Sequence, residues 1–134
     1  MTDGGARVLV VDDDADTLFL VGEMLRLRDC DCVLELVSGG AEAAERLTVL
    51  PAPAVVLLDV NLADGNGLDL LRLLRTDASL EGIPVVMWSG EEDPRVREEA
   101  EALGVTWFTT KPRGLDGLDR FLDRFLALLP PARG

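Results

Sequence analysis

The feature that most constrains this chain is a regular alternation of five short apolar runs with stretches of helical periodicity. The apolar runs are rich in β-branched residues and cover residues 8–11, 32–37, 54–58, 83–88 and 105–109. Continuous apolar runs of this length are typical of strands that are buried on both faces of a sheet. The sequence therefore predicts five interior strands.

Helical patterns separate these strands. The clearest pattern consists of six apolar residues that lie three or four positions apart: Leu118, Phe121, Leu122, Phe125, Leu126 and Leu129. This spacing places the side chains on one face of a helix. Four other helices are predicted over residues 15–28, 41–50, 67–75 and 93–103. The last of these begins with Asp93 as its N-cap and Pro94 at its first helical position.

The strict alternation of strand and helix indicates an α/β fold. This alternation implies right-handed crossovers and a parallel sheet, so we expect a (βα)5 doubly wound five-stranded sheet with helices on both faces. A flavodoxin-like strand order of 2-1-3-4-5 places ligands beyond the carboxyl ends of the strands. The 134-residue chain is predicted to form one domain over residues 7–129, with short mobile tails at residues 1–6 and 130–134.

Polar and charged residues follow four of the predicted strands. They are Asp12, Asp13 and Asp14 after the first strand, Asp59 after the third, Ser89 and Gly90 after the fourth, and Lys111 after the fifth. In the predicted strand order Asp12, Asp13 and Asp59 converge, and each like-charge pair about 4 Å apart costs on the order of 4 kcal/mol at an effective dielectric constant of about 20. A hard divalent cation offsets this repulsion, and Mg²⁺ is the natural choice for oxygen ligands.

Lys111 is the only lysine in the chain, beside twelve arginines. Its compact ammonium group suits a phosphoryl oxygen, whereas an ordinary loop lysine is the alternative. Ser89 supplies a hydroxyl donor and Gly90 leaves space beside it, although a serine followed by a glycine is also a common turn. The presence of suitable residue types at four strand ends favours one functional site over separate local explanations.

The composition excludes several classes of protein. The chain has no histidine, which removes Ser-His-Asp and Cys-His catalysis and most imidazole metal sites. A formal net charge of −12 argues against direct nucleic-acid binding, which needs basic side chains. The N-terminal apolar run is too short for a signal-peptide core or a membrane span, so we expect a cytoplasmic protein. Cys30 and Cys32 lack the further ligands of a zinc site and are expected to be reduced.

The residues at the strand ends lie in segments that resemble the receiver domains of two-component response regulators. The resemblance covers roughly residues 7–128 and rests on four segments. These are Val-Val-Asp-Asp-Asp at 10–14, Leu-Leu-Asp-Val-Asn-Leu at 57–62 with Gly67 eight residues after Asp59, Ile-Pro-Val-Val-Met-Trp-Ser at 83–89, and Phe-Thr-Thr-Lys-Pro at 108–112.

The resemblance implies that Asp59 is a phosphoacceptor. It also implies that Asp12 and Asp13 hold Mg²⁺ together with Asp59 and the backbone carbonyl of Asn61. The phosphoryl group would come from a histidine kinase or a histidine phosphotransfer protein. Such a domain promotes its own phosphorylation and dephosphorylation and is not a turnover enzyme.

The same resemblance implies a conformational switch. Ser89 would hydrogen-bond the phosphoryl group, Lys111 would pair with it, and Phe108 matches the aromatic switch position. The helix over residues 93–103 has few apolar residues to bury and is the expected moving part. We expect a downstream effector protein to dock on the face formed by this helix, the strand over residues 105–109 and the last helix, where Trp107 either contributes to docking or packs between helix and sheet.

Two residues depart from the usual pattern of the family. Ala63 stands where proline is common, and Gly90 stands where alanine is common, but neither change removes a chemical group. Asn61 and Glu91 occupy the positions that tune the lifetime of the phosphoaspartate in this family. The same pair is similar to that of the chemotaxis receivers, which favours short-lived phosphorylation.

Three other functions are compatible with parts of the pattern. A degenerate receiver would act as a phosphorylation-independent binding module. A phosphatase of the haloacid-dehalogenase type also uses an aspartate nucleophile, and Asp12 and Asp14 have its spacing, but the Gly-Thr that should follow and a cap domain are absent from the sequence. A flavin-binding flavodoxin would need a phosphate-binding loop of hydroxyl and glycine residues where this chain has three aspartates.

Overall fold

A five-stranded parallel sheet forms the centre of the molecule. The structure is a computed structural model that describes residues 5–28, 31–49 and 51–130. The sheet has the order β2-β1-β3-β6-β7 and every neighbouring pair is parallel. Its strands are β1 (Ala6–Val11), β2 (Cys32–Val37), β3 (Val55–Asp59), β6 (Val85–Ser89) and β7 (Trp107–Thr110). Counted along the sheet alone this is the order 2-1-3-4-5, so the predicted fold is confirmed.

A short antiparallel hairpin accounts for the two remaining strands. β4 (Asn61–Leu62) and β5 (Gly65–Asn66) pair with each other directly after β3 and lead into α3. This hairpin was not predicted from the sequence, because strands of two residues carry no periodicity. It shapes the loop that begins immediately after Asp59.

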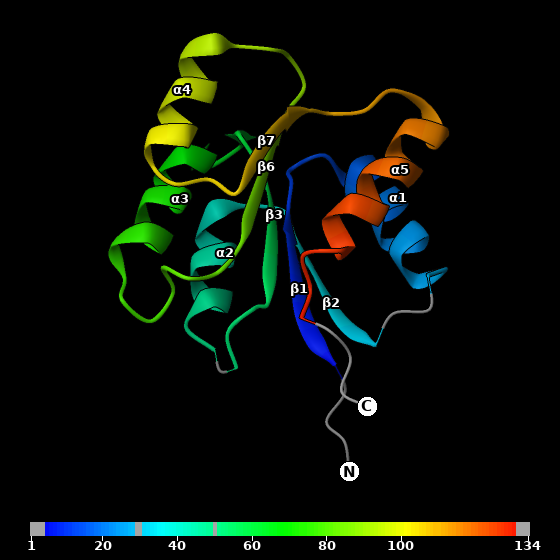
Figure 1. Cartoon of the computed structure of the whole chain (residues 1–134), viewed down its shortest axis with the longest axis horizontal. Coiled ribbons are helices and arrows are strands. Elements are labelled where there is room, and N and C mark those ends of the chain that lie inside the picture. Colours follow the sequence, from blue (N-terminus) through cyan, green and yellow to red (C-terminus); the bar gives the residue numbers. More distant parts are fainter. Residues whose placement is uncertain (1–4, 29–30, 50, 131–134) are drawn as a thin grey trace.

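Five helices cover the two faces of the sheet. They are α1 (Ala15–Arg26), α2 (Gly40–Leu47), α3 (Gly67–Thr76), α4 (Pro94–Ala102) and α5 (Gly114–Leu126). Figure 1 shows α1 and α5 on one face and α2, α3 and α4 on the other. Asp93 caps α4 through a hydrogen bond from the Arg95 backbone N–H, and Pro94 follows it, as predicted. The helices predicted to reach residues 28 and 50 end earlier, at Arg26 and Leu47.

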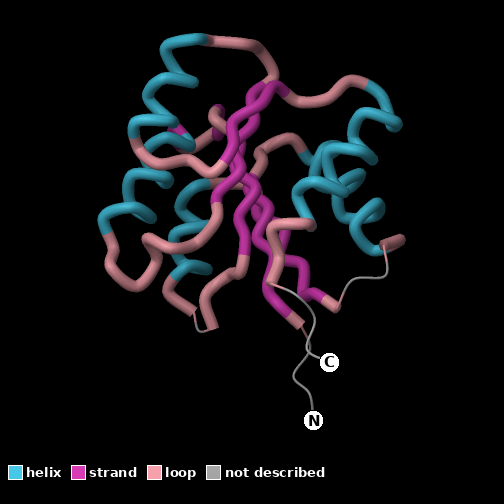
Figure 2. The backbone as a smooth tube through the Cα atoms, viewed as in Figure 1, coloured by secondary structure: helices cyan, strands magenta, loops and turns pink. Residues whose placement is uncertain are grey.

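The two faces of the sheet have different cores. The α2–α3–α4 side is almost entirely aliphatic, and Phe108 is the aromatic residue of that cluster. The α1–α5 side contains Trp88, Phe121 and Phe125. All residues of β3 and β6 are buried, because these central strands are covered by helices on both faces (Figure 2).

The ends of the chain lie mostly outside the described residues. The predicted tails comprise residues 1–6 and 130–134, of which residues 1–4 and 131–134 are not described, while Ala6 is already the first residue of β1. Cys30 also lies outside the described residues, and Cys32 is disulfide-bonded, so the expectation of a reduced Cys32 is wrong. Among the helices in the described ranges, none has the length and apolar character needed to cross a membrane.

Candidate functional site

The carboxyl ends of β1, β3, β6 and β7 bring the predicted site residues to one edge of the sheet. Asp59 is the last residue of β3 and lies opposite Trp88 in the register with β6. Lys111 follows β7, and its backbone N–H donates to the carbonyl oxygen of Ser89 at 2.7 Å. The parallel pairing of the central strands therefore sets the distances within the site.

Three carboxylates form a compact acidic cluster. Ligand oxygens of Asp12, Asp13 and Asp59 all lie within 4.8 Å of one another. Asp12 is 0% exposed and Asp59 is 4% exposed, whereas Asp13 is open to solvent. A set of oxygen donors with one open side fits a hard divalent cation such as Mg²⁺, which keeps several of its waters when it binds. The predicted side-chain ligands are thus brought together.

The environment of Asp59 disfavours the ionised form of its carboxylate. Its Oδ1 accepts a hydrogen bond from the Asn61 backbone N–H at 3.2 Å. Burial raises the pKa of Asp59 from 3.8 to about 6, and the negative charge of Asp12 adds to the rise, while Lys111 opposes it. Burial and a like charge both disfavour an ionised carboxylate. The site therefore favours any cation that can offset these two effects.

Lys111 is the positive group of the cluster. Its Nζ lies 2.8 Å from Asp12 Oδ2 and 3.3 Å from Asp59 Oδ2. Burial acts to lower the pKa of Lys111, but the hydrogen bonds and charges of Asp12 and Asp59 outweigh it, and the pKa is raised. Lys111 thus stays charged and bridges two buried carboxylates.

Asp12 receives hydrogen bonds from two further donors. The Asp14 backbone N–H donates to Oδ1 at 2.9 Å, and the indole Nε1–H of Trp88 donates to Oδ2 at 3.2 Å. From the sequence, Trp88 was predicted only as part of a buried strand. A signal was present, because a buried tryptophan normally finds a partner for its N–H, and the strand ends beside the predicted acidic site.

Asp14 has a different position from its two neighbours. Its carboxylate caps α1, accepting from the Asp16 backbone N–H at 3.1 Å and from the Thr17 hydroxyl at 2.8 Å. The hydrogen bond from Thr17 lowers the pKa of Asp14. The carboxylate that would complete the aspartate pair of a phosphatase is therefore engaged at a helix N-terminus.

The model of the response regulator receiver domain matches residues 8–123, which is most of the chain. This chain belongs to the response-regulator receiver family. A receiver-domain relative, the chemotaxis protein CheY1 of Helicobacter pylori, is 31% identical over 106 residues, which cover 79% of this chain and 85% of CheY1. The Mn²⁺-bound response regulator Rcp1 superposes with a TM-score of 0.85 at 25% identity and covers 95% of this chain and 100% of that chain.

Other relatives of this receiver domain are much longer proteins. RcaC of Microchaete diplosiphon is 32% identical over 121 residues, which cover 88% of this chain and only 18% of RcaC. A protein-glutamate methylesterase/protein-glutamine glutaminase of Archaeoglobus fulgidus is 37% identical over 110 residues, covering 81% of this chain and 30% of that protein. The chain thus spans less than a third of the length of these relatives.

Of the predicted switch residues, Ser89 is the last residue of β6 and Phe108 lies within β7. Ser89 is buried, and its hydroxyl oxygen accepts a hydrogen bond from the Glu91 backbone N–H at 3.3 Å. Phe108 is also buried, and the guanidinium of Arg97 lies over its ring, 4.9 Å from the centroid. Arg97 also donates to the Phe108 carbonyl oxygen at 3.1 Å. Sequence reasoning missed Arg97, which looks like one of many surface charges of α4.

Gly67 has a steric role beside Asp59. A Cβ atom at this position would lie 2.1 Å from the carbonyl oxygen of Asp59, and the Gly67 backbone N–H donates to the Val60 carbonyl at 2.7 Å. Only glycine permits this approach without a backbone shift. Gly67 therefore allows the loop after β3 to close tightly on the strand end.

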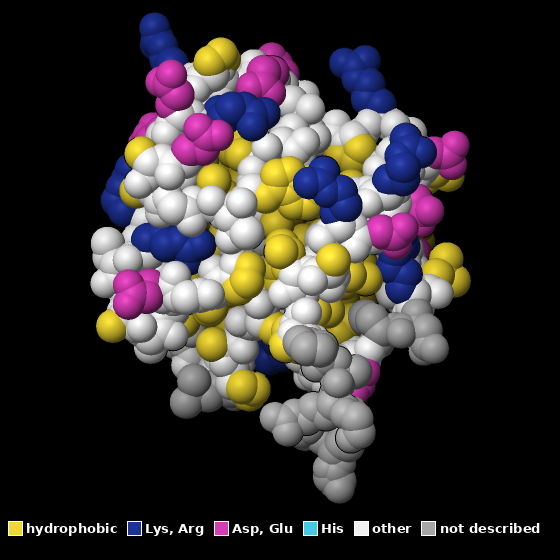
Figure 3. Space-filling view, in the orientation of Figure 1, with side chains coloured by type: hydrophobic (Ala, Val, Ile, Leu, Met, Phe, Trp, Pro, Cys, Tyr) yellow, Lys and Arg dark blue, Asp and Glu magenta, His cyan; other side chains and the backbone are white. Residues whose placement is uncertain are grey.

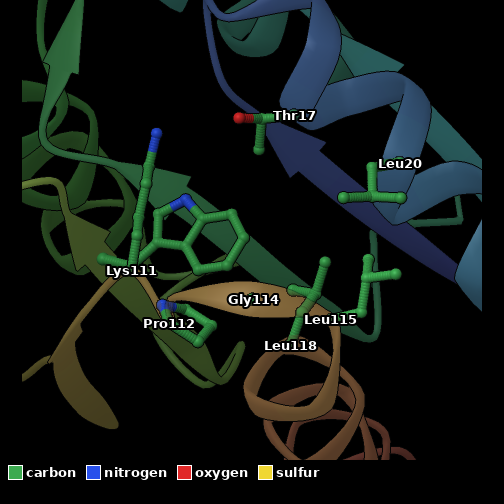
Figure 4. A pocket seen from close by; sticks show the side chains of 8 residues that line it. Thr17, Leu20, Lys111, Pro112, Gly114, Leu115 and Leu118 are labelled. Atoms are coloured by element: carbon green, nitrogen blue, oxygen red, sulfur yellow. The ribbon is translucent and has the colours of Figure 1, made fainter.

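A pocket of about 200 Å³ lies beside the acidic cluster, between α1 and α5. Figure 4 shows Thr17 and Leu20 on its α1 side and Leu115 and Leu118 on its α5 side. Lys111 and Trp88 complete the wall nearest the carboxylates. Trp107 is not part of this lining; it packs against Phe121 of α5, with ring centroids 5.2 Å apart.

Proposed function

We propose that this receiver domain accepts a phosphoryl group on Asp59 in a Mg²⁺-dependent reaction and acts as a signalling phosphoacceptor rather than a turnover enzyme. The observation that carries the proposal is the buried Asp59 carboxylate, which lies within 4.8 Å of two other carboxylates and is paired with Lys111. The donor would be a histidine kinase or a histidine phosphotransfer protein. The fit of the donor set to a hard cation and the Mn²⁺ bound in the similar Rcp1 support the metal dependence.

In the proposed reaction a carboxylate oxygen of Asp59 attacks the phosphorus atom. A new P–O bond forms, the bond from phosphorus to the donor breaks, and its electron pair leaves with the donor. Bound Mg²⁺ would neutralise charge that develops on the transferred group. The side chains of Asp12, Asp13 and Asp59 and the backbone carbonyl of Asn61 would hold it. No general base is needed, because the attacking carboxylate is already ionised.

Lys111 and Ser89 would bind the transferred group. Lys111 Nζ already lies 3.3 Å from the attacking residue, and a point charge is well suited to a phosphoryl oxygen. Ser89 would exchange its present hydrogen bond with the Glu91 backbone for one to the phosphoryl group. Phe108 would then turn, which biases an equilibrium between two conformations of the domain.

The face of α4, β7 and α5 is the proposed docking surface for a downstream effector protein. In Figure 3 apolar side chains gather at the middle of the visible face, between α4 and α5, with Lys and Arg side chains beside them. Arg97 connects Phe108 to α4, so a movement of the ring would change this face. Asn61 and Glu91 favour a short-lived phosphoaspartate, and we place the protein in the cytoplasm.

Intact-mass spectrometry after incubation with acetyl phosphate tests the proposal. We expect a gain of one phosphoryl group in the presence of Mg²⁺, little gain without it, and none in Asp59→Asn. No gain under any condition would instead support a degenerate receiver that binds its partner without phosphorylation. An equal gain in the mutant would place the acceptor elsewhere.

A further inference from the structure

Trp88 lies directly beneath the acidic cluster and is fixed in place by α5. The residue is 1% exposed and sits at the end of β6, one position before Ser89. Its ring stacks on Phe121, with centroids 4.9 Å apart and an interplanar angle of 23°. The indole therefore has little freedom to reorient, and its N–H has a fixed direction.

The fixed N–H points at a carboxylate oxygen that a second donor also uses. Asp12 Oδ2 accepts from Trp88 Nε1 at 3.2 Å and lies 2.8 Å from Lys111 Nζ. Asp12 is fully buried, so a donor that is lost there is not readily replaced by solvent. Lys111 Nζ in turn lies 5.5 Å from the centroid of the Trp88 ring. The Trp88 side chain thus contacts both Asp12 and Lys111, which form an ion pair with each other.

The two donors on Asp12 Oδ2 differ in what they can do. Lys111 has a flexible stem and also reaches Asp59, whereas the indole N–H is held by a stacked ring and only donates. In the proposed function Lys111 would turn toward a phosphoryl oxygen, and Oδ2 would then lose one donor. The indole N–H remains, so the buried oxygen is still hydrogen-bonded and Asp12 keeps its orientation.

We propose that Trp88 is a positioning residue of this site: its indole N–H orients Asp12 for the divalent cation and keeps that carboxylate in place when Lys111 moves to the phosphoryl group. This inference rests on the proposed function. Groups that hydrogen-bond a metal ligand commonly change metal affinity about 10- to 100-fold when they are removed. Trp88 donates such a hydrogen bond to Asp12, one of the proposed metal ligands.

The chain offers a matched control for the test. Trp107 is the only other tryptophan of the sequence, and its ring contacts are with Phe121, at 5.2 Å, and with the guanidinium of Arg124, at 3.9 Å. Trp88→Phe and Trp107→Phe therefore remove the same atoms and disturb the same neighbour, Phe121. Only the first removes a hydrogen bond to a carboxylate of the cluster.

The experiment measures Mg²⁺ affinity by isothermal titration calorimetry in the native chain and in both variants. We expect Trp88→Phe to weaken Mg²⁺ binding about 10-fold or more, and Trp107→Phe to change it less than about twofold. Tryptophan fluorescence measures in addition whether Trp88 senses the bound cation. In Trp107→Phe, where Trp88 is the only indole, the emission should change on Mg²⁺ saturation, and in Trp88→Phe it should stay constant.

A second variant distinguishes the effect of losing the N–H from the effect of losing ring volume. Benzothienylalanine at position 88 keeps the shape of the indole and replaces its N–H by sulfur, so it is available if Trp88→Phe does not fold. It should weaken Mg²⁺ binding as Trp88→Phe does. Native affinity in a folded variant that lacks the N–H, or an equal loss in Trp107→Phe, would overturn the proposal for Trp88. The proposed function fails separately, if the native chain neither binds Mg²⁺ nor gains a phosphoryl group.

Discussion

α4 and α5 flank the same edge strand, β7, but they are held against the sheet in different ways. α5 buries Leu118, Phe121, Leu122 and Phe125. α4 buries only Ala100. The contacts that hold α4 are largely polar: Arg97 binds the Phe108 carbonyl and Glu92, and Glu99 pairs with Arg72 of α3.

This difference assigns the two helices different roles. The aromatic side chains of α5 support Trp88, and through it the acidic site, so α5 forms a fixed wall. Exposed ion pairs contribute little free energy, and an element with few buried apolar contacts opens locally at low cost. α4 is therefore the helix with the lower expected cost of local opening, and the proposed switch would act through it.

The largest expected effect tests the contrast in burial directly. Phe125 is fully buried in the aromatic core, so Phe125→Ala should lower the free energy of unfolding by about 3–5 kcal/mol. Val96 of α4 is only partly buried, and Val96→Ala should cost about 1 kcal/mol or less. Urea unfolding followed by circular dichroism measures both values. Similar losses in the two variants would remove the basis for treating α5 as fixed and α4 as mobile.

A second prediction concerns the electrostatic cost of ionising the buried Asp59 carboxylate at the end of β3. Its pKa is raised from 3.8 to about 6, so the folded chain binds the proton more tightly than the unfolded chain. Stability from this group is present below about pH 4 and is lost as the pH rises toward about 6. Asp59→Asn cannot ionise and should become more stable than the native chain across this range, by on the order of 2–3 kcal/mol above pH 6.

Urea unfolding of metal-free protein between pH 4 and pH 7 measures this difference. Asp13→Asn is the matched control, because Asp13 belongs to the same cluster but is exposed, and its effect should stay within about 0.5 kcal/mol. Added Mg²⁺ should narrow the gap between Asp59→Asn and the native chain. A gap that does not depend on pH would show that burial and Asp12 do not disfavour the charged form.

The fold and the position of the acidic cluster could be predicted from the sequence, whereas the contacts that distinguish α4 from α5 could not. The strand order and the convergence of Asp12, Asp13, Asp59 and Lys111 were predictable, because the chain alternates strictly between strand and helix and these residues follow strand ends. The predicted helix and strand patterns depend on local periodicity, and most of their bounds agree with the structure within a few residues.

The parts that could not be predicted depend on long-range side-chain geometry. The hydrogen bond of Trp88 joins residues 76 positions apart, and no local pattern records the direction of an indole N–H. Arg7 lies in a strand that looks apolar, yet it is buried and pairs with Glu35 at 2.5 Å. Arg97 is one of several arginines, and only the packing of α4 on β7 distinguishes it.

The smallest expected effect compares two arginines that lie over aromatic rings of the same strand. Arg97 of α4 lies over Phe108, and Arg124 of α5 lies over Trp107 at 3.9 Å. Arg97→Met should make amide hydrogen exchange within α4 about fivefold faster, which corresponds to roughly 1 kcal/mol of local opening free energy. Arg124→Met should leave exchange within α5 nearly unchanged, because four buried side chains still hold that helix.

Hydrogen-exchange mass spectrometry with peptides from both helices measures the two variants under the same conditions. Faster exchange in α4 alone would mean that Arg97 stabilises the closed position of that helix. In that case a phosphoryl group at Asp59 should raise α4 exchange in the native chain and raise it less in Arg97→Met, where the contact is already lost. Equal acceleration of α4 and α5 would instead indicate that the arginine contacts are interchangeable, and that the mobility of α4 has another source.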